Sequence, residues 1–184
     1  MKYVLITGSS GLVGSEAVNF FIKKKFKIIT VDNNLRKYFF GKNADTNWQK
    51  KNQIKKFKNK IIHNSVDIRN YKKITNIFFK YKNKIKCIIH AAAQPSHDWA
   101  YKDPTLDFDV NARATLHLLE CTKKFCSKAT FIYVSTNKVY GDTPNKLKIK
   151  EKKTRFEIVD KKYKKGINEN LSIDKSTHSL FGVS

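Results

Sequence analysis

The chain has 184 residues, of which 40% are hydrophobic and 12% aromatic. This composition excludes an intrinsically disordered protein, and no apolar run approaches the roughly 20 residues needed to span a bilayer. The apolar run at the start is too short and too interrupted for the core of a signal peptide. We therefore expect a folded cytoplasmic protein with no membrane partner.

The net charge is +23, which would suit a nucleic-acid-binding protein. The basic residues are nearly all lysines, however, and they are spread along the chain. Arginine is rare, although its bidentate guanidinium recognises bases and phosphates better than lysine does. We expect no specific nucleic-acid partner and keep a basic nucleic-acid-binding protein as a minor alternative.

The cysteines Cys87, Cys121 and Cys126 lie in apolar segments and form no CxxC pair. This pattern supports neither a zinc site nor a disulfide framework. We therefore expect buried free thiols and no metal site.

Strand-like and helix-like segments alternate along the first 135 residues. Strands are predicted at residues 2–7, 26–31, 60–64, 86–90 and 130–135, and helices at residues 12–25, 71–81 and 106–125. In the first helix, the side chains expected to face inward are Val13, Ala17, Phe20 and Phe21. Residues 33–59 are predicted to be loop with one short helix near Trp48, and residues 142–178 show no strong period.

This alternation predicts an α/β fold, because strands separated by helices form parallel sheets. Right-handed crossovers then give a Rossmann-type doubly wound sheet with helices on both faces and the strand order 3-2-1-4-5. We expect this sheet to be incomplete at the C-terminus.

Three glycines follow the first strand and open the first helix. Gly8, Gly11 and Gly14 form the pattern G-x-x-G-x-x-G, in which the first permits a tight turn, the second lets the backbone approach a pyrophosphate, and the third allows close helix–strand packing. Asp32 ends the second strand, about 18 residues past Gly14, near the position of a ribose-binding acid. A carboxylate there favours NAD over NADP, although Arg36 lies nearby. The alternative is a glycine turn that binds no ligand.

Four segments in order carry a family resemblance: TGSSGLVG at residues 7–14, DIRN at 67–70, HAAAQ at 90–94 and YVSTNKVYG at 133–141. Together they resemble the NAD-dependent epimerase/dehydratase family, the extended branch of the short-chain dehydrogenases. The run STNKVYGD and the final HSLFGVS are most similar to the CDP-paratose 2-epimerase group. The resemblance covers essentially the whole chain, and its motifs are specific in combination.

The resemblance implies NAD as cofactor and a nucleotide sugar, CDP-linked, as substrate. It implies that Asp67 accepts a hydrogen bond from the adenine amino group, with a helix N-cap as the alternative, and that Ile68 packs on the ring. Asn111 would support the active site, with a solvated helix position as the alternative. The predicted cofactor-binding residues are Gly8, Ser10, Gly11, Leu12, Val13, Gly14, Asp32, Asn33, Arg36, Asp67, Ile68, Ala91, Ala92, Ala93, Gln94, Asn111 and Ser135.

The catalytic pattern of the family is only partly present. Thr136 matches the serine or threonine whose hydroxyl binds the reacting sugar oxygen, whereas the aligned tyrosine is replaced by Phe181, which has no ionisable proton. The partner lysine would fall at position 185. Other candidates for the proton acceptor are Tyr163, Tyr140, His178 and Lys138, and spacing selects none of them.

We therefore expect an isomerase or dehydratase of nucleotide sugars, represented here by its cofactor-binding half. Residues 1–141 are predicted to be the NAD-binding domain, and residues 142–184 the irregular start of a truncated substrate region. Family chains are about twice as long, so the fifth strand and the long helix should be partly uncovered, and the full-length form is expected to be a homodimer. The alternative is a non-catalytic NAD-binding module or an inactive fragment.

Overall fold

A computed structural model describes residues 1–136, 139–173 and 179–184. They form two compact units, each described by itself below. The first comprises residues 1–134 together with Ser184, and the second comprises residues 135–183.

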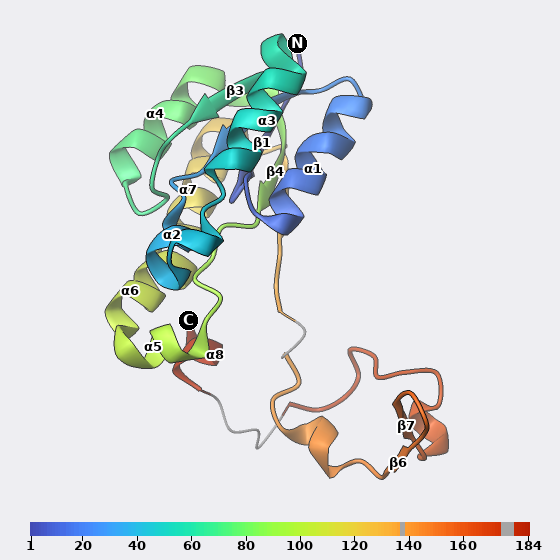
Figure 1. The fold of residues 1–184 in the computed structure, drawn as a ribbon. Helices are drawn as coiled ribbons and strands as arrows, with labels where there is room; N and C mark the ends of the chain where they lie inside the picture. Colours follow the sequence, from blue (N-terminus) through green and yellow to red (C-terminus); the bar gives the residue numbers. More distant parts are fainter. Residues whose placement is uncertain (137–138, 174–178) are drawn as a thin grey trace. The chain divides into compact units, whose positions relative to one another are not determined.

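The first unit is built on a parallel sheet. Its strands, in chain order, are β1 (Tyr3–Thr7), β2 (Lys27–Val31), β3 (Ile61–Asn64), β4 (Ile85–His90) and β5 (Thr130–Tyr133). Their spatial order is β3-β2-β1-β4-β5 (Figure 1), which confirms the predicted doubly wound sheet. The chain leaves β1 toward β2 and later returns on its other side as β4. This reversal creates a crevice at the carboxyl ends of the strands, the usual ligand position in such sheets.

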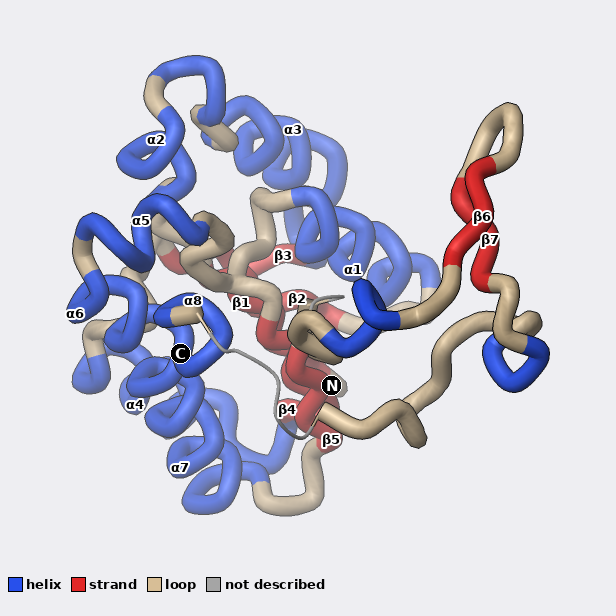
Figure 2. The backbone as a smooth tube through the Cα atoms, turned by 90° about the horizontal axis from the view of Figure 1, so that it is seen from below, coloured by secondary structure: helices blue, strands red, loops and turns tan. Residues whose placement is uncertain are grey.

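Helices cover both faces of the sheet, with strands running between the two helical layers (Figure 2). On one face, α4 (Tyr71–Tyr81) and α7 (Ala114–Cys126) pack on Leu5, Ile29 and Ile88. On the other face, α1 (Leu12–Lys23) packs on Val4, Ile6 and Ile28, and α3 (Asn47–Phe57) contributes Phe57. Successive strand residues therefore point to opposite apolar cores, which explains why the strands read as continuous apolar runs.

The helix α4 has the predicted bounds because its sequence is strongly amphipathic. Ile74, Ile77, Phe78 and Tyr81 are its buried residues, at spacings that place them on one face. The side chain of Asn70 caps the helix by accepting a hydrogen bond from the Lys73 amide (3.0 Å).

The predicted inward face of α1 is wrong at two positions: Val13 and Phe20 are about half exposed. The buried residues are Gly14, Ser15, Val18 and Ile22. Gly14 packs against the preceding turn, and residues four and eight positions further along the helix share its face. The close packing of Gly14 therefore sets the rotation of the whole helix.

Residues 33–59 contain more helix than predicted. The segment forms α2 (Leu35–Phe40), the 3-10 turn η1 (Lys42–Ala44), α3 (Asn47–Phe57) and the start of the turn η2 (Lys58–Lys60). A third 3-10 turn, η3 (Lys82–Lys84), precedes β4. The helix α3 is longer than predicted because its lysine-rich sequence has little of the apolar periodicity on which the prediction of helices depends.

The predicted helix 106–125 is interrupted and has a helical neighbour before it. The segment forms α5 (His97–Lys102), α6 (Pro104–Phe108) and the π-helical turn η4 (Asp109–Arg113), which runs directly into α7. Ser96 and Asp103 accept hydrogen bonds from the backbone amides of Trp99 (3.3 Å) and Leu106 (2.9 Å), so each begins a short helix.

The second unit holds short elements. They are η5 (Thr143–Lys146), an antiparallel pair of β6 (Ile149–Glu151) and β7 (Phe156–Ile158), η6 (Lys161–Tyr163) and α8 (Leu180–Val183). The hairpin is an addition to the prediction, which expected no regular structure there. Nowhere in the described ranges is there a helix with both the length and the apolar character that a membrane span requires.

Packing of α7 on the sheet should contribute strongly to stability. Leu118 is 0% exposed in this core, whereas Leu116 on the same helix is 55% exposed. We predict that Leu118→Ala lowers the free energy of unfolding by about 3 kcal/mol, because it leaves a cavity. Leu116→Ala is the matched control and should change it by less than about 0.5 kcal/mol. Urea denaturation of both variants checks this, and equal effects would contradict the packing described.

Candidate functional site

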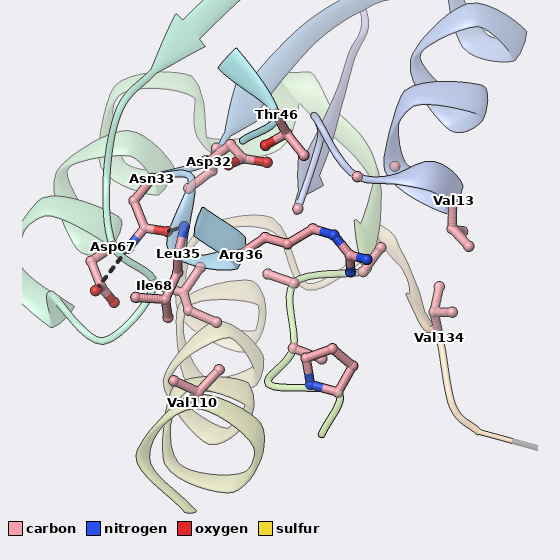
Figure 3. A pocket seen from close by; sticks show the side chains of 18 of the residues that line it. Val13, Asp32, Asn33, Leu35, Arg36, Thr46, Asp67, Ile68, Val110 and Val134 are labelled. Carbon is pink, nitrogen blue, oxygen red and sulfur yellow. Dashed lines mark hydrogen bonds between the residues drawn. The ribbon is translucent and has the colours of Figure 1, made fainter. Parts of the chain in front are cut away.

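A cleft of about 290 Å³ lies at the carboxyl ends of the strands in the first unit (Figure 3). Its walls come from the glycine turn after β1, the segment after β2, the start of the segment after β3, and the loop after β4. The lining residues are Gly8, Gly11, Leu12, Val13, Gly14, Val31, Asp32, Asn33, Leu35, Arg36, Phe39, Thr46, Val66, Asp67, Ile68, Ala91, Ala92, Ala93, Pro95, Val110 and Val134.

At two positions, the glycine turn requires a residue without a side chain. Gly8 has a left-handed φ of +64°, and a Cβ there would lie 2.7 Å from the backbone of Ala91. A Cβ on Gly14 would lie 2.1 Å from the carbonyl oxygen of Gly8. The turn is closed by a hydrogen bond from the Gly11 amide to that same oxygen (3.0 Å). The sequence thus forces β1 and α1 into close contact around an open turn.

The N-terminus of α1 faces this cleft without a side-chain cap. Gly11 precedes the helix and provides no capping group, and the first turn contains no acidic residue. The first amides of a helix have no partner within the helix, and its dipole adds partial positive charge there. This end of the cleft is therefore suited to an anionic group.

Asp32 joins the end of β2 to the glycine turn. Its Oδ2 accepts a hydrogen bond from the Ser10 amide (2.8 Å), and its Oδ1 accepts one from the Asn34 amide (2.8 Å). A carboxylate has about four acceptor positions, so each oxygen keeps capacity for a further donor. Asp32 is thus held in place by the backbone while still lining the cleft.

Asp67 lies at the far side of the cleft and is tied to its neighbours. It accepts hydrogen bonds from Asn33 Nδ2 (2.9 Å) and from three donors of Arg69: the amide (2.9 Å), Nε (3.0 Å) and Nη2 (2.7 Å). Burial raises the pKa of Asp67, but hydrogen bonds and charge from Arg69 outweigh burial and hold it below the ordinary value. The cap of α4 is Asn70 and not Asp67, so the N-cap alternative for Asp67 is wrong.

Apolar and cationic side chains shape the interior of the cleft. Leu35, Ile68 and Val110 gather on one wall below Asp32 and Asn33 (Figure 3). The Arg36 side chain extends across the middle, and its Cζ lies 5.1 Å from the centre of the Phe40 ring. The cleft therefore combines an apolar wall with a positive charge near its centre.

Gln94 and Asn111 lie behind the lining. Asn111 Oδ1 accepts from the Gln94 amide (2.9 Å), and its Nδ2 donates to the Gln94 carbonyl (3.1 Å). Asp107 Oδ1 accepts from Gln94 Nε2 (2.6 Å) and from Asn111 Nδ2 (3.1 Å). All three side chains are buried. They fix the loop after β4 from the rear, and Asn111 is not the solvated helix residue of the alternative interpretation.

A second chain of hydrogen bonds links Thr115 through His90 and Thr7 to the Ala92 amide in the loop after β4. Thr115 Oγ1 donates its proton to the Asn111 carbonyl (2.5 Å), so it must accept from His90 Nε2 (2.9 Å). Burial lowers the pKa of His90 from 6.5 to about 4, so the ring is neutral and His90 Nδ1 accepts from Thr7 Oγ1 (2.7 Å). Thr7 Oγ1 in turn accepts from the Ala92 amide (3.2 Å).

The predicted residues separate into three groups. Those that line the cleft are Gly8, Gly11, Leu12, Val13, Gly14, Asp32, Asn33, Arg36, Asp67, Ile68, Ala91, Ala92 and Ala93. Ser10, Gln94 and Asn111 lie outside the lining: the Ser10 amide binds Asp32, whereas Gln94 and Asn111 bind each other and Asp107. Ser135, Thr136 and Phe181 belong to the second unit, as do Tyr140 and Tyr163, whereas Lys138 and His178 lie outside the described residues.

Several lining residues are absent from the prediction. Leu35, Val66 and Val110 are sequence neighbours of predicted residues, so adjacency would have found them. Phe39 and Thr46 come from the segment after β2, whose position depends on tertiary packing. Within the described ranges, no group of three or more His, Cys, Asp or Glu side chains could hold a metal ion.

Comparison with known proteins gives the family. A family model described as GDP-mannose 4,6 dehydratase matches residues 5–157. The chain belongs to the NAD-dependent epimerase/dehydratase family. It is 34% identical over 181 residues to the CDP-paratose 2-epimerase of Salmonella typhi, a match that covers 98% of this chain and 49% of that protein. The chain thus spans about half the length of the curated relatives it matches.

Two solved structures of this family share the fold. The UDP-glucose 4-epimerase of Thermus thermophilus in complex with NAD has a TM-score of 0.62 and 26% identity, covering 81% of this chain and 42% of that one. The UDP-glucose 4-epimerase of Thermotoga maritima with UDP-glucose has a TM-score of 0.59 and 25% identity, covering 76% and 40%.

The buried neutral His90 should make the stability of the first unit sensitive to acid. Its pKa is lowered from 6.5 to about 4, so its stabilising contribution is complete above pH 6.5 and is lost as the pH falls toward 4. The loss amounts to about 3 kcal/mol. We predict that His90→Gln is less stable at neutral pH and shows a correspondingly smaller fall in unfolding free energy. Urea denaturation across this range checks it, and parallel pH profiles of the two proteins would contradict it.

Proposed function

We propose that this chain binds NAD in the cleft and forms the cofactor-binding half of a nucleotide-sugar epimerase or dehydratase. The observation that carries the proposal is the bond between the Asp32 carboxylate and the Ser10 amide. This bond fixes an acid for ribose hydroxyls directly beside the uncapped helix N-terminus that would hold the pyrophosphate. The Thermus thermophilus relative, which is described in complex with NAD, supports the choice of cofactor.

The residues of the cleft fit a dinucleotide. Side chains at Gly8 or Gly14 would fill the space between β1, α1 and the loop after β4. The apolar wall of Leu35, Ile68 and Val110 matches the flat face of an adenine ring. The acceptor positions of Asp67 are occupied by Asn33 and Arg69, so a contact with the adenine amino group would require one of these bonds to exchange.

NAD would supply reversible acceptance of a hydride from a sugar carbon. The chain's own residues would bind and orient it: the α1 amides the pyrophosphate, Asp32 the adenosine ribose, and the loop Ala91–Ala93 one side of the ligand. The negative charge of Asp32 would repel a 2′-phosphate, and this favours NAD over NADP. The guanidinium of Arg36 would balance ligand phosphate charge near the centre of the cleft.

The residues proposed to contact the substrate belong to the second unit. We propose that Ser135 contacts the cofactor and that the Thr136 hydroxyl binds the reacting sugar oxygen. Phe181 cannot accept a proton, so another group must take the proton from the sugar hydroxyl. The proposed substrate is a CDP-linked sugar epimerised at C2. The support for it is the match to the CDP-paratose 2-epimerase over nearly the whole chain.

A second candidate is an NAD-binding module without catalysis, and Phe181 favours it. The two functions predict the same cofactor affinity and differ in turnover. If a chain extended by its natural downstream sequence, where one exists, binds NAD and leaves CDP-sugars unchanged, the module is supported. Formation of an epimerised or keto sugar rejects it.

The cofactor proposal predicts a change in selectivity at Asp32. Asp32→Asn removes the negative charge, so it should lower the ratio of NAD affinity to NADP affinity by about tenfold. Isothermal titration of the wild-type chain and the variant with both cofactors measures this ratio. The ratio of the two affinities is informative because damage to the turn would weaken the binding of NAD and of NADP by the same factor.

Asp160→Asn provides the control, since it removes an exposed charge in the second unit. Its cofactor ratio should equal that of the wild-type chain. A wild-type chain that binds neither cofactor, or an Asp32→Asn ratio equal to the wild-type ratio, contradicts the proposed role.

A further inference from the structure

Gln53 is a polar side chain buried on a helix that is otherwise mostly exposed. It is 5% exposed and is the buried residue of α3, whereas its neighbours Asn52 and Ile54 are exposed. Its Nε2 donates a hydrogen bond to the carbonyl oxygen of Ser9 (2.9 Å), which lies 44 residues earlier in the glycine turn. A buried amide is costly unless it is paired, so this contact is a specific one.

The Ser9 carbonyl and the Ser10 amide belong to the same planar peptide unit. Gln53 binds the carbonyl side of this unit (2.9 Å), and the Asp32 carboxylate binds its amide side (2.8 Å). The two side chains come from different elements, α3 and the end of β2. Together they fix the rotation of one peptide plane from opposite sides.

The two ends of the turn are held by hydrogen bonds between backbone groups. The Gly8 amide donates to the Val31 carbonyl (2.9 Å), and the Gly11 amide donates to the Gly8 carbonyl (3.0 Å). The central peptide unit lies between these two glycines, and its rotation is set by ψ of Ser9 and φ of Ser10. Ser9 Oγ is buried and has no hydrogen-bond partner among the described residues, so the Ser9 side chain does not anchor the turn.

We propose that Gln53 is a positioning residue for the dinucleotide: by holding the Ser9 carbonyl it keeps the glycine turn in the shape that receives the pyrophosphate and keeps the Ser10 amide on Asp32. This proposal rests on the proposed function. Gln53 touches no ligand itself, since it is absent from the lining of the cleft. Its effect is transmitted through one peptide plane.

Three variants test this role. Gln53→Met keeps a similar length but removes the donor, and Gln53→Glu replaces the donor by a carboxylate that faces the Ser9 carbonyl. Asn52→Asp adds the same charge at the neighbouring exposed position and is the matched control. At about pH 8, NAD affinity should fall by about tenfold in both Gln53 variants and by less than about twofold in the control.

Lower pH separates positioning from packing. A buried carboxyl has a raised pKa, and once protonated its O–H can donate to the Ser9 carbonyl. At about pH 5.5 the NAD affinity of Gln53→Glu should therefore return to within about threefold of wild type, whereas Gln53→Met stays about tenfold weaker. The NAD affinity of the wild-type chain is measured at both pH values as well. This measurement corrects for protonation of His90, His63 and the native carboxylates between the two pH values.

Hydrogen exchange of the Ser10 amide gives a readout that needs no ligand. Exchange should be faster in Gln53→Met and unchanged in Asn52→Asp, because only the former frees the central peptide plane. A wild-type chain without NAD affinity overturns both the proposed function and this inference. Wild-type NAD binding with unaltered affinity and unaltered Ser10 exchange in the Gln53 variants overturns the inference alone.

Discussion

The hydrogen bond between the Asp32 carboxylate and the Ser10 amide joins the two parts of the cleft that must stay in register. One part is the glycine turn after β1, and the other is the end of β2. Since the same carboxylate also holds the Asn34 amide, it fixes the start of the segment that brings Leu35, Arg36 and Thr46 to the cleft. The shape of the site therefore depends on a charge that also faces the proposed ligand.

The loop after β4 is held by a different kind of contact. Neutral or fully paired polar groups bind it from the rear: Thr7 at Ala92, and Asn111 with Asp107 at Gln94. Such buried networks are rigid because leaving any member unpaired is costly. Because this loop is held rigidly on the side away from the cleft, the cleft can bind a ligand without reorganising.

The sheet and the glycine end of the cleft can be predicted from the sequence because both depend on local signals, whereas the family resemblance indicates residues such as Ile68 and Asn111. Continuous apolar runs marked the strands, and Gly8, Gly14 and Asp32 marked the turn and its acid. The burial of Gln53 and the exposure of Val13 had no such signal, because they depend on how α3 and α1 pack. Gln94 and Asn111 were recognised as important, but only the three-dimensional arrangement gives their contacts to each other.

The π-helical turn at Asp109–Arg113 decides where the chain length between α6 and α7 can vary. An α-helix rotates by about 100° per residue. Deleting one residue from the α-helical start of α7 would therefore swing α6 around the helix axis and separate Asp107 from Gln94, its hydrogen-bond partner. A π-helical turn holds one residue more than an α-helical turn, so it can lose one residue by closing into ordinary α-helix while the flanking helices keep their rotation. Length variants of this segment should accordingly fall in the π-helical turn, whereas α6 and α7 should differ by substitution.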